Sequence, residues 1–297
     1  MSDTPFVFVL GTGRCGSTLV HEVMARHRSA GFVSNIDDHL AGRDLGGRWN
    51  AALYRRTPVA TTGKGRLVRY APSEAYRLLD EQVSPMLSTP FRDLRADDVT
   101  PWLERRFREF FERRAASQGS GVFVHKFTGW PRAGFISRIL PEARFVHVIR
   151  DGRAVANSWL QMQWWEGHRG PAQWHWGPLP DAYAAEWDES GRSFVLLAGL
   201  AWKLLIDAFQ AARSEIPEDH WLDVRYEDVV AAPRETMETV LDFAGMDWND
   251  DFDAALGRYR FGTGRTDAFR RDLDPGGLGL LDRSLGAHLG RYGYPKL

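Results

Sequence analysis

The segment VLGTGRCGSTLV, residues 9–20, constrains the fold more than any other part of the chain. Gly11 and Gly16 stand five positions apart and are followed by the hydroxyl pair Ser17 and Thr18. This is the spacing of the phosphate-binding loop G-x-x-x-x-G-K-[ST], whose backbone N–H groups surround an anion at the start of a helix. Ser17 stands where that pattern has lysine, so the loop keeps its anion cradle but lacks the cation that reaches a γ-phosphate.

The residues on either side of this segment predict a strand before it and a helix after it. FVFVL, residues 6–10, is a short apolar run with β-branched residues, which is typical of a buried parallel strand. Apolar residues at helical spacing follow from position 19. The alternative is a Gly-rich turn with only a structural role. The strand, the hydroxyl pair and a cation within the loop favour an anion site made of Gly11, Gly13, Arg14, Cys15, Gly16, Ser17 and Thr18.

Further strands and helices alternate along the chain. We expect strands over 31–35, 121–126, 144–150 and 220–226, and helices over 98–117, from about 153, over 191–213 and over 233–245. Strands separated by helices predict an α/β fold, a doubly wound parallel sheet flanked by helices, with ligands at the carboxyl ends of its strands. Residues 1–297 are expected to form a single domain. Insertions at about 37–98 and 160–190 interrupt the pattern and are expected on the substrate side.

Composition narrows the class of protein. A formal net charge of −1 over 297 residues argues against a general nucleic-acid binder. The one cysteine excludes an intramolecular disulfide and a cysteine-based metal cluster. We find no apolar run of transmembrane length and no leader-like N-terminus, so we expect a cytoplasmic protein. The oligomeric state stays open.

A second motif, FVHVIRDGRAVANSWL, covers residues 145–160. It places Arg150 at the end of a predicted strand and Ser158 eight residues later, within the next predicted helix. An arginine fork and a hydroxyl that converge from these two elements suit a terminal phosphate dianion. The alternative is a surface turn in which Asp151 pairs locally with arginine.

Taken together, the two motifs resemble the sulfotransferases that use 3′-phosphoadenosine 5′-phosphosulfate (PAPS), particularly their bacterial and tyrosylprotein branch. Residues 224–246, VRYEDVVAAPRETMETVLDFAGM, are similar to the segment after the family's fourth core strand. Residues 269–295, FRRDLDPGGLGLLDRSLGAHLGRYGYP, are similar to the family's tail, with Phe269 in place of a tryptophan. The resemblance implies that the first loop holds the 5′-phosphosulfate and that Arg150 and Ser158 hold the 3′-phosphate. It adds Tyr226 and Arg270 to the expected nucleotide-binding residues.

The resemblance also implies a reaction, the in-line transfer of a sulfuryl group from PAPS to a hydroxyl or amine. The acceptor would be a small molecule, a glycan or a lipid. Negative charge develops on the bridging oxygen as its bond breaks, so cations placed there accelerate the step. Arg14 and Lys126 are the expected cations, although a lysine at a strand end can also point into solvent. No metal ion is expected.

The general base is the least constrained residue. Some family members carry a histidine two positions after the lysine, where this chain has Thr128. Other branches use a carboxylate after the first helix and second strand, and there the chain contains SNIDDHL, residues 34–40. We expect Asp38 to be the base, with Asp37 second and His125 or His39 after them. The alternative is an acidic turn that caps a helix.

Tryptophans concentrate in the second insertion. Indole faces suit sugar rings or aromatic and lipid-like acceptors, but the same residues can instead anchor a long insertion to the core. The residues are Trp159, Trp164, Trp165, Trp174, Trp176 and Trp187. The segment over 55–70 is basic, which would favour an acidic acceptor. The alternative is an ordinary surface loop whose charges are solvated.

Two rival functions remain. A Mg²⁺-dependent kinase would use Asp151 at the end of a hydrophobic strand to serve the metal, but it lacks the loop lysine. A non-catalytic glycan-binding protein would use the tryptophans alone.

Overall fold

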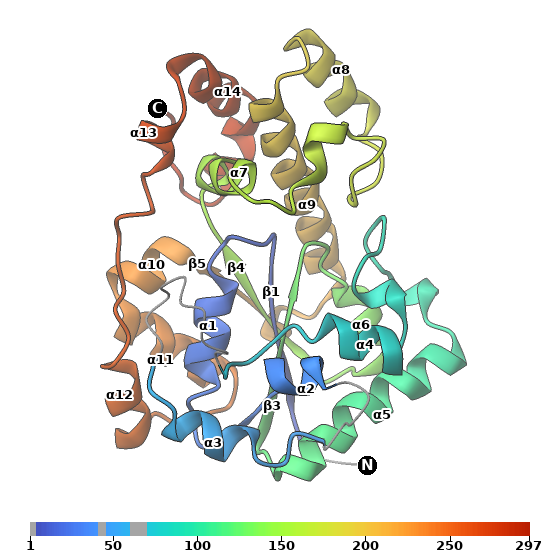
Figure 1. Ribbon diagram of the computed structural model, residues 1–297, viewed down its shortest axis with the longest axis vertical. Coiled ribbons are helices and arrows are strands. Elements are labelled where there is room, and N and C mark those ends of the chain that lie inside the picture. Colours follow the sequence, from blue (N-terminus) through green and yellow to red (C-terminus); the bar gives the residue numbers. More distant parts are fainter. Residues whose placement is uncertain (1–3, 41–45, 60–69) are drawn as a thin grey trace.

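The computed structural model describes residues 4–40, 46–59 and 70–297. Its centre is a parallel sheet of five strands in the order β2-β3-β1-β4-β5 (Figure 1). The strands are β1 (Phe6–Gly11), β2 (Ala30–Gly31), β3 (Val122–Thr128), β4 (Arg144–Ile149) and β5 (Trp221–Arg225). The predicted α/β fold is confirmed, and the sheet is doubly wound.

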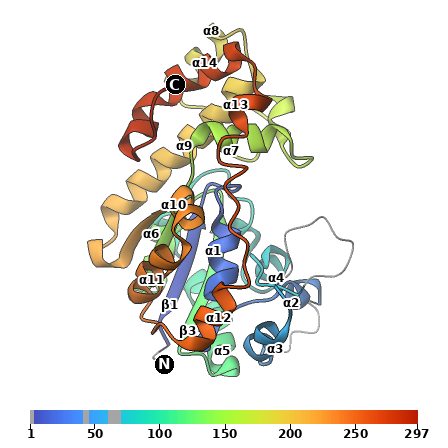
Figure 2. The same ribbon diagram turned by 90° about the vertical axis from the view of Figure 1, so that its left-hand side faces the viewer.

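Helices cover both faces of the sheet (Figures 1 and 2). The first insertion contains α2 (Asn35–His39), α3 (Asn50–Arg56), α4 (Tyr76–Gln82) and the 3₁₀ turns η2 (Pro85–Leu87) and η3 (Ala96–Asp98). The second contains η4 (Glu166–Arg169) and α8 (Asp181–Glu189). The remaining elements are α1 (Ser17–Met24), α5 (Pro101–Gln118), α6 (Ala133–Ile139), α7 (Gly152–Leu160), α9 (Phe194–Glu215), η5 (Glu218–His220), α10 (Tyr226–Ala231), α11 (Pro233–Phe243), α12 (Asp250–Leu256), α13 (Phe269–Asp272) and α14 (Pro275–Arg291).

The side chains of β1 alternate between two hydrophobic clusters, one on each face of the sheet. Phe6, Phe8 and Leu10 join an aromatic-rich cluster on one face, while Val7 and Val9 join a cluster of β-branched residues on the other. All five side chains are buried, because side chains alternate across a strand and both faces of this sheet are covered. This explains why the strand is an unbroken apolar run in the sequence.

The order of the strands positions the site. The chain leaves β1 toward β2 on one side of the sheet, and it leaves β4 toward β5 on the other. Ligands bind in such folds where the winding changes direction, at the carboxyl ends of the strands. Here that point brings the loop after Gly11 beside Arg150, which follows β4. Two motifs far apart in sequence therefore meet at the carboxyl end of the sheet, after the neighbouring strands β1 and β4.

The predicted strand over 31–35 is shorter than expected. Only Ala30 and Gly31 pair with β3. The N–H of Phe32 donates to Gln118 Oε1 at 3.1 Å, and its carbonyl accepts from Asn50 Nδ2 at 3.0 Å. Side chains therefore take the place of a neighbouring strand, and Ser34 caps α2 directly afterwards.

The helix α9 corrects the expectation that no apolar segment reaches transmembrane length. Residues Phe194–Glu215 are long and apolar enough to cross a membrane by length and composition. Eleven of its residues are buried, and α9 packs against α7 and α14. A core helix of a globular protein meets the same criterion, so this feature is weak grounds for a membrane span.

Candidate active site

The loop after β1 presents the start of α1 to a large cleft. Gly16 and Gly13 have φ angles of 97° and 83°, in the left-handed region that favours glycine. A Cβ on Gly16 would lie 2.2 Å from the ring of Tyr226, so the close packing of that ring also requires glycine. In the part of the chain that the structure describes, no side chain caps α1, so the first N–H groups of this helix keep their capacity to bind an anion.

Three arginines converge beside this loop. Arg14 Nε donates to Ser158 Oγ at 3.0 Å, and Arg150 donates to the carbonyls of Arg14 at 3.0 Å and Arg265 at 2.6 Å. Burial and the neighbouring guanidinium groups of Arg265 and Arg150 lower the pKa of Arg14. Among the residues that the structure describes, none of the three has a carboxylate partner. A cluster of cations without counter-charge is a site for an anion of high charge.

The strand β3 places Lys126 on the other side of the loop. Its ammonium group donates to Thr18 Oγ1 at 2.6 Å and lies 3.3 Å from Glu74 Oε1. Glu74 also accepts a hydrogen bond of 2.7 Å from Thr128 Oγ1. The lysine is 5% exposed, so it is held against the loop and does not extend into solvent. A cation, a hydroxyl and a carboxylate thus meet next to the anion site.

Asp37 and Asp38 have structural contacts. Asp37 accepts from the backbone N–H of Ser34 at 2.9 Å in a capping box, and from the side-chain amide of Asn50. Asp38 accepts from the N–H of Leu78 at 3.0 Å, in the first turn of α4. Neither aspartate lines the cleft formed by the described residues. Both therefore match the helix-capping alternative, whereas Glu74 lines the cleft and pairs with Lys126.

The other expected residues divide into two groups. Gly13, Arg14, Gly16, Ser17, Thr18, Arg150 and Tyr226 line the cleft, whereas Gly11 and Cys15 are buried beneath the loop. Arg270 is exposed, and its guanidinium lies 3.4 Å from Asp267 rather than in the cleft. Arg260 and Arg265 line the cleft in its place. The signal for them was the glycine-flanked arginine in RFGTGR, residues 260–265.

The cleft has a volume of ≈ 1610 Å³ and two chemically different sides. We call one the loop side, lined by residues 12–14 and 16–19 of the loop and α1 together with Glu22, Arg150, Tyr226, Arg260 and Arg265. We call the other the insertion side, lined by Glu74, Tyr76, Asp80, Ser88, Thr89, Pro90, Lys126, Thr128, Gly129, Trp130, Arg132, Met162, Trp164, Glu166, His175 and Trp176. Arginines dominate the first side, and the second combines aromatic surface with carboxylates and the cations Lys126 and Arg132.

The tryptophans of the second insertion are mostly part of the core. Trp159, Trp165, Trp174 and Trp176 are buried in one cluster with residues of α7, α9 and α14. Trp164 is 47% exposed and lines the cleft. Most of these residues therefore anchor the insertion, as the structural alternative predicted. The basic segment over 55–70 lies largely outside the described residues.

The histidines that ranked after the aspartates do not reach the cleft. His125 is fully buried among phenylalanines on the face of β3 opposite Lys126, and burial lowers its pKa to about 3. His39 lies at the exposed end of α2. Neither residue lines the cleft that the described part of the chain forms.

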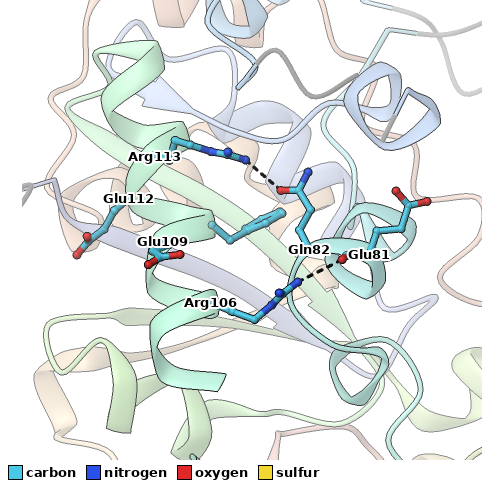
Figure 3. A pocket seen from close by; sticks show the side chains of 7 residues that line it. Glu81, Gln82, Arg106, Glu109, Glu112 and Arg113 are labelled. Atoms are coloured by element: carbon cyan, nitrogen blue, oxygen red, sulfur yellow. Dashed lines mark hydrogen bonds between the residues drawn. The ribbon is translucent and has the colours of Figure 1, made fainter. Parts of the chain in front are cut away.

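A separate groove of ≈ 630 Å³ lies between α4 and α5 (Figure 3). Its rim carries charges of both signs, with Arg113 donating to Gln82 and Arg106 to the carbonyl of Glu81. The residues expected to bind ligand are elsewhere. Helix α4 thus has one face toward this groove and another, with Tyr76 and Asp80, toward the cleft.

Comparison with known proteins identifies the family. A sequence model described as "Sulfotransferase family" matches residues 5–250, more than half of the chain. The chain belongs to the sulfotransferase family.

Solved structures of sulfotransferases share the fold. The sulfotransferase STF9 from Mycobacterium avium is 13% identical, with 99% of this chain and 78% of that chain covered and a TM-score of 0.60. The sulfotransferase domain from the curacin biosynthetic pathway is 12% identical, with full coverage of both chains and a TM-score of 0.53. Retinol dehydratase, solved with androsterone and inactive cofactor PAP, is 12% identical, covers 96% of this chain and 80% of that chain, and has a TM-score of 0.41. That last likeness carries no argument about this chain.

The side chain of Asp151 bears on the kinase alternative. Both of its carboxylate oxygens accept from Arg153, at 3.0 and 2.7 Å, and one also caps α7. Arg153 is buried and pairs with Asp282 as well. An aspartate held in this way is a structural partner of arginine. In the described residues, no group of three metal-binding side chains was found.

Proposed function

We propose that this sulfotransferase moves a sulfuryl group from PAPS to a hydroxyl or amine of a small-molecule, glycan or lipid acceptor. The observation that carries the proposal is the division of one cleft around the loop. Three guanidinium groups that have no carboxylate partner among the described residues lie at one side, and the Lys126–Glu74 pair lies at the other. The first arrangement suits the phosphates of the nucleotide, and the second suits transfer chemistry.

The loop side would hold the nucleotide. The N–H groups at the start of α1 and the side chain of Thr18 would bind the 5′-phosphosulfate. Arg150, Ser158 and Arg265 would bind the 3′-phosphate, with Arg14 between these two positions because it contacts both Ser158 and Arg150. The 3′-phosphate is what distinguishes this nucleotide from ATP.

The insertion side would hold the acceptor and the proton acceptor. Glu74 would take the proton of the attacking hydroxyl as the new S–O bond forms. The bond between sulfur and the 5′-phosphate oxygen would break, and Lys126 would stabilise the charge that develops on this oxygen. The products are the sulfated acceptor and adenosine 3′,5′-bisphosphate (PAP). Thr128 orients Glu74 through its 2.7 Å hydrogen bond.

Binding of PAP tests the function without a known acceptor. A ligand that binds only the native state raises its apparent stability, so saturating PAP should raise the melting temperature in the presence of a chelator. ATP with Mg²⁺ serves as the comparison. If ATP with Mg²⁺ raises the melting temperature and PAP leaves it unchanged, the kinase reading replaces the proposal. If PAP binds as expected, incubation with labelled PAPS and a panel of phenols, glycans, lipids and peptides would identify the acceptor.

A further inference from the structure

Trp159 has a hydrogen-bond donor with no partner next to the phosphate loop. Its side chain is fully buried, and within the described part of the chain no acceptor lies within hydrogen-bonding reach of Nε1. A buried donor without a partner costs about 1–3 kcal/mol. Native proteins satisfy most such groups, so an exception beside a binding site calls for an explanation.

Gly13 creates the opening toward this donor. A Cβ on Gly13 would lie 3.8 Å from Trp159 Nε1 and 4.0 Å from Thr128 Cβ. Gly13 and Thr128 both line the cleft, and Thr128 carries the hydrogen bond to Glu74. Trp159 itself is not among the described residues that line the cleft, so its indole N–H lies just beneath Gly13, close to where a group would pass from the nucleotide on the loop side to the acceptor on the insertion side.

The indole ring is held in place by a neighbouring tryptophan. It packs against Trp176 with ring centroids 4.8 Å apart and an interplanar angle of 30°. Trp176 in turn packs against Trp174 at 5.2 Å and His175 at 4.1 Å. A donor fixed in this way needs no reorganisation when negative charge arrives, which is the property of a preorganised electrostatic site.

We propose that Trp159 Nε1–H donates a hydrogen bond to an oxygen of the sulfuryl group during transfer. This inference rests on the proposed function. It gives a role in sulfuryl transfer to Trp159, which was not among the site residues that the resemblance implied. The sulfuryl oxygens carry negative charge in the ground state and in the transition state, so a donor aimed at them stabilises both. The residue is distinct from the cations that bind the phosphates.

The substitution Trp159→Phe removes the N–H and keeps an aromatic ring against Trp176. Affinity for PAPS, measured by calorimetry without acceptor, should fall about 10-fold or more, the scale of one hydrogen bond to a charged group. Affinity for PAP, which lacks the sulfuryl group, should stay within about twofold. The free variant loses an unpaired buried donor but also leaves a cavity where the larger ring was, so its folding is checked by its melting temperature before the affinities are compared.

A matched control is Trp202→Phe. Trp202 is also fully buried, and its Nε1 has no partner among the described residues, but it packs against Gly152 at the start of α7 and not against Gly13 of the loop. Its substitution should leave both affinities unchanged. Equal losses of PAP and PAPS affinity in Trp159→Phe would make Trp159 a support of the loop and overturn the proposal. Unchanged PAPS affinity would overturn it as well.

A measurement on the parent protein keeps the test independent of folding. In protein labelled with ¹⁵N-tryptophan, one indole N–H signal should move downfield with PAPS and not with PAP. Trp159→Phe, if folded, assigns that signal. If PAP and PAPS give the same indole spectrum, the inference fails while the proposed function stands, since PAP binding alone supports the latter. If neither nucleotide binds, the proposed function itself fails.

Discussion

The two sides of the cleft are built in different ways. The loop side comes from one short segment, residues 12–19, and from positions directly after β4 and β5, with the arginines of 260–265 added. The insertion side is assembled from α4, the stretch 88–90, the end of β3 and the tryptophan-rich segment. A local segment leaves a motif in the sequence, whereas an assembled surface leaves only scattered residues. The contrast explains why the first was predicted in detail and the second was not.

The largest expected effect tests the insertion side. Glu74→Gln keeps the hydrogen bond from Thr128 and removes the charge and basicity, so kcat should fall by about 10²–10⁴-fold with PAP affinity within a few fold. Steady-state kinetics with an identified acceptor and calorimetry with PAP would measure the two quantities.

Asp38→Asn is the matched control for Glu74→Gln, because its side-chain oxygen still accepts from Leu78. Its turnover should be nearly normal. If Asp38→Asn lowered kcat as far as Glu74→Gln, proton transfer would not be confined to the insertion side.

The next effect tests the loop side. Arg150→Ala should weaken PAPS binding by about 2–4 kcal/mol, since it removes a charge-assisted contact from a partly desolvated anion. Adenosine 5′-phosphosulfate has no 3′-phosphate, so its binding should respond much less. Titration of both nucleotides against both proteins gives the comparison.

Arg270→Ala is the control for this arginine, because Arg270 is exposed and pairs with Asp267. It should leave both affinities unchanged. Equal losses for the two nucleotides in Arg150→Ala would show that this arginine supports the loop through its bonds to the carbonyls of Arg14 and Arg265.

A smaller effect concerns the stability of the first insertion, residues 37–98. Burial raises the pKa of Asp93 to about 6, while its carboxylate accepts from the N–H of Arg132 at 2.6 Å. The fold then binds the proton more tightly than the unfolded chain, so this group lowers stability as pH rises from about 4 to 6. Asp93→Asn keeps the acceptor oxygen and should gain about 1–3 kcal/mol at pH 7.5.

The gain from Asp93→Asn should shrink strongly by pH 4 and disappear below about pH 3, where the aspartate is protonated in both states. Urea denaturation at several pH values would measure it. A gain that is the same at pH 4 and pH 7.5 would mean that the burial of this charge is not its cause.

The smallest effect tests the structural role of Asp38. Asp38→Ala removes the acceptor for the N–H of Leu78 in the first turn of α4 and should cost about 1 kcal/mol of unfolding free energy. PAP affinity should not change, because the loop side does not depend on α4. A loss of PAP affinity without a loss of stability would contradict this assignment.

Local patterns in the sequence determined most of the fold. The apolar run of β1 required cover on both faces, and Thr100 with Pro101 defined the start of α5, where the threonine accepts from the N–H of Leu103. The positions of the loop, Lys126 and Arg150 at strand ends beside one cleft were also predicted, because their spacing relative to strand ends is a property of a short stretch of chain. Each of these signals depends on residues within about one element of each other.

Only the tertiary structure decided which carboxylate and which tryptophan approach the loop. Glu74 precedes a short helix in a long insertion, and nothing in its neighbouring sequence separates it from a helix-capping acid such as Asp38. It reaches Lys126 because α4 lies against the end of β3, where Tyr76 also bonds to Thr128. Trp159 faces Gly13 because α7 begins at the switch point of the sheet. Local spacing specifies the elements, but contacts between distant elements depend on how their apolar faces pack.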